Sequence, residues 1–317
     1  MSATTTTTET STVGGCTATV TTTVTTVKPV DGTAGAFGGA APPTKDTMTV
    51  GYWKIRGLAQ AIRVLCEFCD FEFENQMFEQ TPAPRPIPEK MCVGHPFPSM
   101  EAYEESKKCW FDVKQTVMGG YHSPNLPFLI DGDVKLSESN AILRYLGSKA
   151  AATGGKFSTI MGSTPAEVAA NEFTIEKAME LRNKLIAVGY GTFVPSFKGT
   201  IAEIMGGEGR LACDYYDEIA AEYKSKIPDD NRNFEAYISH GGGPYFAGSH
   251  LTVCDFHMYE LLDQQRSMFG PEIYRGFPKI EAFMEAFGSI PVVVAAYKKY
   301  DLPANNEMAW TTVANIV

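Results

Sequence analysis

The chain has 317 residues, of which 44% are hydrophobic and 20% charged, as is typical of soluble globular proteins with about two domains at this length. The formal net charge of −10 argues against a nucleic-acid-binding protein, which needs a basic face, and against adsorption to anionic membranes. The seven cysteines are scattered and odd in number, so they predict a reducing compartment, the cytoplasm, and not a disulfide framework.

Residues 1–46 differ from the rest of the chain in composition. They are rich in Thr, Gly, Ala and Pro and nearly lack aromatic residues. Such a segment cannot bury enough apolar surface to offset the entropy lost on ordering, so it is predicted to be a disordered leader. It has no Arg and no apolar signal core, which argues against a targeting peptide.

The first globular stretch reads TVGYWKIRG and covers residues 49–57. Val50, Tyr52 and Trp53 favour a strand. A helix is expected next, with Gln60 and Arg63 on its polar face, because apolar residues recur at helical spacing: Leu58, Ile62, Leu65, Cys66 and Cys69. The Tyr52 hydroxyl, just before a strand-to-helix turn, is well placed for catalysis, although a plain aromatic strand residue gives the same pattern.

The remaining N-terminal elements complete an α/β unit. Residues 71–78 alternate in polarity as a strand does, and the proline-rich loop 80–106 contains at most a short helix near its end. Residues 128–136 are two apolar runs around Asp-Gly-Asp, which predicts a β-hairpin. The polar cluster 137–140 then begins a helix, whose N-terminus favours an anion.

From Ala166 onward the hydrophobic period is helical almost throughout, so the second half is predicted to be all-helical. Thr252, followed three residues later by Asp255, indicates a capping box. The boundary between the halves is expected near residues 151–155, where Ala and Gly gather.

Two patterns suggest other chemistry. Cys66 and Cys69 form a CxxC pair, but Cys66 lies too far into the predicted helix for its N-terminus to activate a thiol, so both are interpreted as core residues. His257 and Glu260 form an HxxE pair without further ligands, so no metal is expected.

The strongest signal is PNLPFLIDG at residues 124–132 followed by SESNAI at 137–142. Together with GYWKIRGLAQAIR, the spacing of Trp110 and Lys114, and YFAGSHLTVCDF, these motifs resemble the cytosolic glutathione transferases, most of all the mu class. The resemblance runs from about Met48 to Asp301. It implies a thioredoxin-like glutathione-binding domain over 47–152, an all-helical domain over 158–303 and a C-terminal tail over 304–317.

The resemblance also implies how glutathione binds. The backbone of Leu126, ahead of a cis Pro127, pairs with the cysteinyl part of glutathione as an added strand does. Ser139 takes the γ-glutamyl carboxylate at a helix start, and Glu138 takes the ammonium. Further implied binding residues are Tyr52, Trp53, Trp110, Lys114, Asn125 and, reaching the neighbouring subunit's ligand in a homodimer, Glu180.

Tyr52 matches the family's catalytic tyrosine, whose hydroxyl donates a hydrogen bond to the sulfur and favours the thiolate. The thiolate attacks a hydrophobic electrophile, which is detoxified by conjugation. The implied electrophile pocket is apolar: Trp53, Ile55, Leu58, Ile186 and Tyr190, with the tail around Trp310 closing it.

Some positions depart from the mu-class pattern. The loop 80–106 is longer, Lys107 stands at the position of an arginine, and Ser123 replaces the aromatic residue that locks mu-class dimers. A two-fold dimer is still expected, through a different lock. Two other functions remain open: a non-catalytic ligand carrier or crystallin-like relative, and a glutathione-dependent isomerase of the sigma, prostaglandin synthase type.

Overall fold

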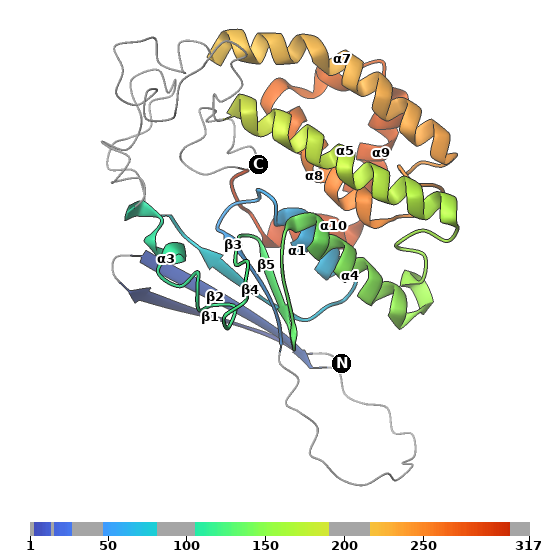
Figure 1. Ribbon diagram of the computed structural model, residues 1–317. Helices are drawn as coiled ribbons and strands as arrows, with labels where there is room; N and C mark the ends of the chain where they lie inside the picture. Colours follow the sequence, from blue (N-terminus) through green and yellow to red (C-terminus); the bar gives the residue numbers. More distant parts are fainter. Residues whose placement is uncertain (1–2, 14–15, 27–46, 81–104, 190–215, 305–317) are drawn as a thin grey trace, which may run out of the picture.

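The computed structural model describes residues 3–13, 16–26, 47–80, 105–189 and 216–304. Figure 1 shows a β-sheet on one side of the molecule and a bundle of long helices on the other, with α1, α4 and α10 between them. The sheet has six strands in the order β1-β2-β4-β3-β5-β6. This arrangement places the turn after β3 where the sheet meets the helical bundle.

The centre of the sheet is a βαβ unit. Strands β3 (Met48–Trp53) and β4 (Phe73–Phe78) are parallel and are joined by helix α1 (Gln60–Phe68). Parallel strands need such a crossover, and the apolar face of α1 packs on the sheet. The predicted hairpin is confirmed as β5 (Phe128–Asp131) and β6 (Val134–Ser137), with β5 antiparallel to β3.

The N-terminal segment differs from the sequence-based expectation of disorder. Strands β1 (Ala3–Val13) and β2 (Cys16–Thr26) form an antiparallel hairpin, and β2 pairs with β4 from Ala18–Phe78 to Thr22–Glu74. Thr and Val are β-branched and favour extended backbone. The N–H and C=O groups along the outer edge of β4 can pair with a further strand. The composition argument considered burial alone and therefore missed this backbone pairing. Residues 27–46 lie outside the described part.

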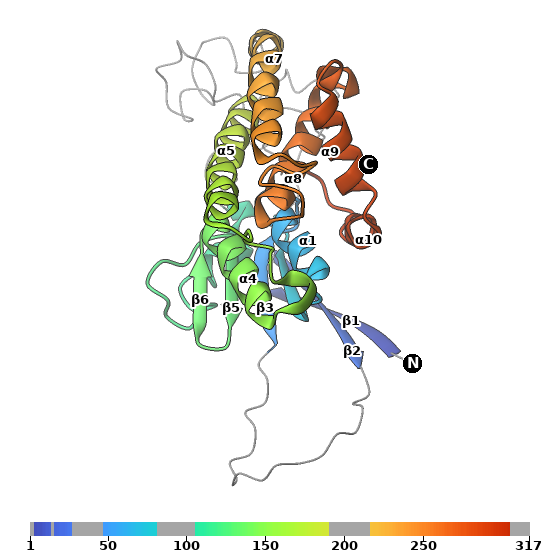
Figure 2. The same ribbon diagram turned by 90° about the vertical axis from the view of Figure 1, so that its right-hand side faces the viewer.

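The second half is helical, as predicted, and α8 lies at its centre (Figure 2). Thr252 and Asp255 form the expected capping box at the start of α8. Helix α4 (Ser139–Thr153) ends the first half. The described helices of the second half are η1 (Gly155–Phe157), α5 (Pro165–Gly189), α7 (Tyr216–Gly241), α8 (Val253–Phe269), η3 (Pro271–Tyr274), α9 (Pro278–Gly288) and α10 (Pro291–Lys299). Helix α3 (Lys108–Phe111) belongs to the first half. Among the described helices none alone could span a membrane; only α9 and α10 together pass by length and composition, and they are bent by 73°.

One hydrophobic core joins the two halves. Phe68 at the end of α1 packs edge-on against Phe256 of α8, with ring centroids 5.1 Å apart. Cys66 and Cys69 lie in this core, and burial raises the pKa of the Cys66 thiol above its ordinary value and that of Cys69 to about 12. Thiols that stay protonated are poor nucleophiles, so the interpretation of the CxxC pair as core residues is confirmed.

Candidate active site

Tyr52 lies near the end of β3, with only 6% of its surface exposed, and its ring rests against Gly57 in the following turn. The backbone N–H of Leu58 donates a hydrogen bond to its hydroxyl. Burial raises the pKa of Tyr52, and this exceeds the lowering by the Leu58 hydrogen bond and by the charges of Arg182 and Arg63. The hydroxyl is therefore protonated at neutral pH and can donate to an anion.

Gly57 is required by this contact. Its φ is +42°, and a Cβ at this position would lie 2.6 Å from Cε1 and 2.7 Å from the hydroxyl oxygen of Tyr52. We expect Gly57→Ala to displace the Tyr52 ring and to lower turnover more than tenfold, because a shift of about 1 Å at a reacting group can cost about 10²-fold. Steady-state kinetics of wild type and Gly57→Ala would measure the change in turnover. The matched control is Gly132→Ala, since Gly132 also has a positive φ of +59° but nothing within 4 Å of its would-be Cβ; equal losses in both variants would contradict the expectation.

Arg63 on α1 donates hydrogen bonds to backbone carbonyls of the same turn. Its side chain is fully buried on α1, where Nη1 donates to the carbonyl oxygen of Ile55 at 2.9 Å and Nη2 to that of Trp53 at 3.3 Å. Nε donates to Oδ1 of Asn75 on β4 at 3.1 Å. Burial lowers the pKa of Arg63 to about 10, so it still carries its charge at pH 7. Helical periodicity placed Gln60 and Arg63 on the polar face of this helix, opposite the core, but both side chains are buried.

Arg56 ties the turn to the helical half. Its Nε and Nη2 donate to the two carboxylate oxygens of Glu260 at 3.0 and 2.8 Å, and Nη2 also donates to Asp263 at 2.7 Å. The backbone N–H groups of Arg56 and Gly57 donate to the carbonyls of residues 303 and 304. The turn after Tyr52 is thus fixed by α8 and by the segment after α10.

An apolar cluster surrounds the Tyr52 ring. Ile55 and Ala59 are buried with it, and the partly exposed side chains of Trp53, Leu58 and Leu126 pack against them. The peptide bond between Leu126 and Pro127 is cis, as the resemblance implied. The structure therefore brings Tyr52 together with Trp53, Ile55, Leu58 and Leu126, while Asn125 beside them is exposed.

Glu138 and Ser139 form the start of α4. Glu138, the residue before the helix, has φ +75°, a conformation that non-glycine residues rarely adopt. It is exposed, Ser139 is buried, and no side-chain cap was found at this described helix end. Helix N-terminal N–H groups without a side-chain cap favour an anionic ligand, and a strained residue beside them is typical of binding sites.

The other predicted residues lie further from Tyr52. Trp110 is 3% exposed and packs against Phe78 and Phe128, with ring centroids 5.2 and 6.1 Å away, so its ring is mainly a core side chain. Lys114 and Ile186 are half-buried, and no contact between either of them and Tyr52 is found in the described ranges. Glu180 on α5 is exposed and pairs with Lys177 at 2.8 Å. Tyr190 and Trp310 lie outside the described residues.

Known proteins match most of this chain. The description "Glutathione S-transferase, N-terminal domain" matches residues 93–148, and "Glutathione S-transferase, C-terminal domain" matches residues 213–301. Glutathione S-transferase Mu 3 of Homo sapiens is 30% identical over 84% of this chain and 95% of its own length. The chain belongs to the glutathione S-transferase family. Glutathione S-transferase Mu 1 of Oryctolagus cuniculus is 31% identical over 80% of this chain and 90% of its own length.

Solved glutathione S-transferases share the fold. The crystal structure of the glutathione S-transferase Blo t 8 matches with a TM-score of 0.59 at 24% identity, over 83% of this chain and 99% of that one. The pi-class glutathione S-transferase of Onchocerca volvulus matches with a TM-score of 0.56 at 20% identity, with the same coverage of 83% and 99%. At these identities the likeness shows the fold, so the predicted fold class is confirmed.

Three arginines were not identified from the sequence as parts of the site. Arg56 and Arg63 look like exposed charges in the sequence because their partners are backbone carbonyls or residues far along the chain. Arg182 on α5, one turn before Ile186, lies close enough for its charge to lower the pKa of Tyr52. The only sequence signal for Arg56 is its place between Tyr52 and Gly57.

His257 and Glu260 do not act as a pair in this chain. Glu260 binds Arg56, and it also accepts hydrogen bonds from Gln264 at 2.6 Å and from the Tyr297 hydroxyl at 2.5 Å. His257 is buried, and burial lowers its pKa to about 4. Within the described ranges, no group of three or more His, Cys, Asp or Glu residues could hold a metal ion.

Buried His257 makes the stability of this chain depend on pH. Its pKa is about 4 in the folded chain and about 6.5 when unfolded. The histidine therefore binds protons more tightly in the unfolded state. The stability that neutral His257 contributes is complete above pH 6.5 and is lost as the pH falls towards 4. Between pH 7 and pH 5, wild type should lose about 2 kcal/mol more unfolding free energy than His257→Gln, measured by denaturant titration.

Titrating groups that wild type and His257→Gln share cancel when the two proteins are compared. Asp255, whose pKa burial raises to about 6, acts in the opposite sense but is present in both proteins. The control is His240→Gln, at an exposed position near the end of α7. If wild type and His257→Gln lose the same stability between pH 7 and pH 5, the assignment of a buried neutral His257 is wrong.

Proposed function

We propose that this chain is an active glutathione transferase that holds the glutathione thiol as a thiolate for attack on hydrophobic electrophiles. The observation that carries the proposal is the protonated, buried Tyr52 hydroxyl, which is held by the Leu58 N–H in the same apolar cluster as Leu126 of the cis Leu126–Pro127 bond. A site of this kind offers a fixed hydrogen-bond donor beside an apolar surface. That combination suits an anionic sulfur attacking an apolar carbon.

Glutathione is proposed to bind across three of the described features. Its cysteinyl backbone pairs with the main chain at Leu126 and Pro127, next to the Tyr52 cluster. Its γ-glutamyl carboxylate meets Ser139 and the α4 N-terminus, while exposed Glu138 takes the ammonium. Lys114, with Trp110 and Asn125 nearby, is proposed for the glycyl carboxylate. This placement puts the thiol beside the Tyr52 hydroxyl.

The proposed chemistry needs a shift in thiol pKa. A free thiol titrates near 8.5, and lowering this value by about 2 units requires about 3 kcal/mol of differential stabilisation. The Tyr52 hydrogen bond supplies part of it, and the positive charges of Arg63 and Arg182, which already favour an anion at Tyr52, also favour a thiolate beside it.

In the reaction step, the thiol proton passes to solvent and the sulfur electron pair forms a carbon–sulfur bond. With an aromatic chloride, the carbon–chlorine bond breaks and chloride leaves with the bonding electrons. Ile55, Leu58 and Trp53 form the apolar wall on which such a substrate packs.

The test is an activity panel with wild-type protein, glutathione and several electrophile classes, together with calorimetric titration of glutathione. We expect glutathione binding and measurable conjugation of at least one aromatic chloride, epoxide or enal. Glutathione binding with no conjugation across the panel would favour the carrier instead. Rearrangement of an endoperoxide without net consumption of glutathione would favour the isomerase.

We further propose that the protein works as a cytoplasmic homodimer. Glu180 and Phe173 both lie exposed on α5, about two helical turns apart, and Phe173 keeps 47% of its surface exposed. Aromatic residues are enriched in the cores of subunit interfaces, so Phe173 suits such an interface, from which Glu180 would reach the neighbouring subunit's glutathione. A monomer-sized species in sedimentation at micromolar concentration would remove this role of Glu180.

A further inference from the structure

Strands β1 and β2, here called the N-terminal hairpin, extend the sheet beyond β4. Figure 1 shows this hairpin at the outer edge of the sheet, with α3 close to one end of it. The ladder between β2 and β4 runs from Ala18–Phe78 to Thr22–Glu74, and β2 also contacts α3. The N-terminal hairpin therefore contacts both the central sheet and the short helix that carries Trp110.

Helix α3 depends on tertiary contacts for its position. It has four residues, and a helix of this length is not stable alone in water. The Trp110 ring packs edge-on against Phe78, with ring centroids 5.2 Å apart. The Cys109 thiol donates a hydrogen bond to the carbonyl oxygen of Glu79, the residue after β4, at 3.3 Å. These contacts hold α3 against the end of β4.

The N-terminal hairpin supports the same end of β4. Phe78, the last residue of β4, is paired with Trp53 of β3 on one side and with Ala18 of β2 on the other. Without β2, the backbone groups on the second side would face water, as at any open sheet edge. Pairing on both sides fixes the main chain at Phe78, and with it the ring on which Trp110 rests.

Lys114 lies one helical turn after Trp110. Its backbone N–H donates to the carbonyl oxygen of Trp110 at 2.8 Å, and its side chain is half-buried. A displacement of α3 would therefore displace the Lys114 ammonium, which is proposed to bind the glycyl carboxylate of glutathione. The attraction between two opposite charges weakens as the distance between them grows, so glutathione affinity depends on where α3 lies.

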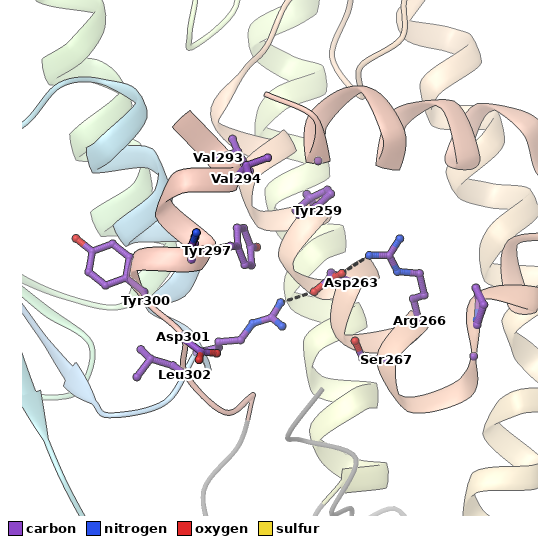
Figure 3. A pocket seen from close by; sticks show the side chains of 15 residues that line it. Tyr259, Asp263, Arg266, Ser267, Val293, Val294, Tyr297, Tyr300, Asp301 and Leu302 are labelled. Carbon is purple, nitrogen blue, oxygen red and sulfur yellow. Dashed lines mark hydrogen bonds and ion pairs between the residues drawn. The ribbon is translucent and has the colours of Figure 1, made fainter. Parts of the chain in front are cut away.

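The turn beside Tyr52 is held by other contacts. Figure 3 shows Asp263 of α8, which pairs with Arg56 of this turn at 2.7 Å. The backbone N–H groups of Arg56 and Gly57 donate to residues 303 and 304. These contacts include no residue of the N-terminal hairpin. Loss of the ladder between β2 and β4 should therefore leave the Tyr52 hydroxyl in place.

We propose that the N-terminal hairpin increases the affinity of this chain for the glycyl end of glutathione, because it holds α3 and Lys114 in place against β4. This inference rests on the proposed function, in which Lys114 binds the glycyl carboxylate. The hairpin lies outside the proposed contacts with glutathione and acts through α3. Its effect is confined to ligands with a glycyl residue. γ-Glutamylcysteine, which has the same thiol and γ-glutamyl group but no glycine, should bind equally well with or without the ladder.

The test is a full-length double variant, Val20→Pro with Thr21→Pro. Successive backbone N–H groups of a strand point to opposite neighbours, so one of the two prolines removes a donor to β4. We expect the Kd for glutathione, measured by calorimetry, to rise about fivefold, as loss of a partly exposed ion pair can cause. The Kd for γ-glutamylcysteine should not change. An unchanged Kd for glutathione, or equal weakening of both ligands, would overturn the proposal.

Two further variants separate backbone pairing from side-chain effects. Val20→Thr with Thr21→Val exchanges two β-branched residues and keeps both backbone N–H groups, so it should bind glutathione as wild type does. Lys114→Met should weaken glutathione binding selectively, and adding the two prolines to it should weaken binding little further, because both changes remove the same interaction. Equal weakening by the exchange variant and the proline variant, or full additivity with Lys114→Met, would contradict the proposal.

Hydrogen exchange of the free protein tests the hairpin without any ligand. We expect residues 108–114 to exchange faster in the proline variant than in wild type, and α4 to exchange equally in both, because local opening follows the loss of local contacts. Unchanged exchange at residues 108–114 would overturn the inference even if glutathione binds. Wild-type protein that binds no glutathione would refute the proposed function and the role in affinity, whereas faster exchange would still confirm that the hairpin holds α3.

Discussion

Tyr52→Phe is expected to lower kcat for conjugation about 10²- to 10³-fold near neutral pH, the usual effect of removing one fixed hydrogen-bond donor to a reacting anion. The Kd for glutathione should change little, because the backbone of Leu126 and the α4 N-terminus remain. The phenylalanine ring keeps the contact with Gly57 and the apolar cluster, so the fold is preserved. Steady-state kinetics with an aromatic chloride and calorimetry with glutathione measure the two quantities.

The rate deficit of Tyr52→Phe should also depend on pH. Without the hydroxyl, the pKa of the bound thiol lies closer to its ordinary value of about 8.5, so the rate deficit of the variant should narrow as the pH rises towards that value. Tyr145→Phe is the control, because Tyr145 on α4 donates to Asp131 of β5 at 2.6 Å and does not belong to the Tyr52 cluster. Unchanged turnover in Tyr52→Phe, or a deficit that is constant with pH, would refute the role given to the hydroxyl.

Arg56→Met is expected to cost about 3–5 kcal/mol of unfolding free energy, because it leaves buried carboxylates without their cation. Glu260 keeps only 1% of its side chain exposed, and Asp263 keeps 14%. Burial lowers the pKa of Arg56, but its partners Glu260, Tyr297 and Asp263 together outweigh this effect and hold the pKa well above its ordinary value. Denaturant unfolding at pH 7 would show the loss as a lower midpoint.

Lys54→Met is the matched control for Arg56→Met. Lys54 lies two residues earlier and pairs with Glu79 at 3.0 Å, but both side chains are about 40% exposed. Surface pairs of this kind contribute about 0–1 kcal/mol, so the control should shift the unfolding midpoint only slightly. Similar small shifts in both variants would mean that the Arg56 ion pairs do not stabilise the fold.

The sequence predicted the local features of this molecule well. The strand carrying Tyr52, the hairpin 128–136 and the capping box at Thr252 follow from periodicity and turn chemistry, which depend on neighbouring residues only. The cis bond before Pro127 followed from a resemblance to known proteins and not from spacing. These elements placed Tyr52 and Leu126 correctly within one cluster.

The missed features depend on distant parts of the chain. Arg56 finds Glu260, 204 residues later, and no periodic pattern links the two. Arg63 is buried by carbonyls that the turn after Tyr52 directs inward, and helical spacing alone assigned it to the surface. The N-terminal hairpin pairs with β4 through backbone groups that composition does not represent.

The turn after Tyr52 forms late during synthesis of the chain, because its partners are translated late. Domains fold as they leave the ribosome, N-terminal parts first, but Arg56 depends on Glu260, and the backbone of residues 56 and 57 depends on residues 303 and 304. The strand that carries Tyr52 is therefore made early, whereas its turn reaches its final geometry only when nearly the whole chain has been translated. A nascent chain cannot complete the turn beside Tyr52 before its helical half has folded.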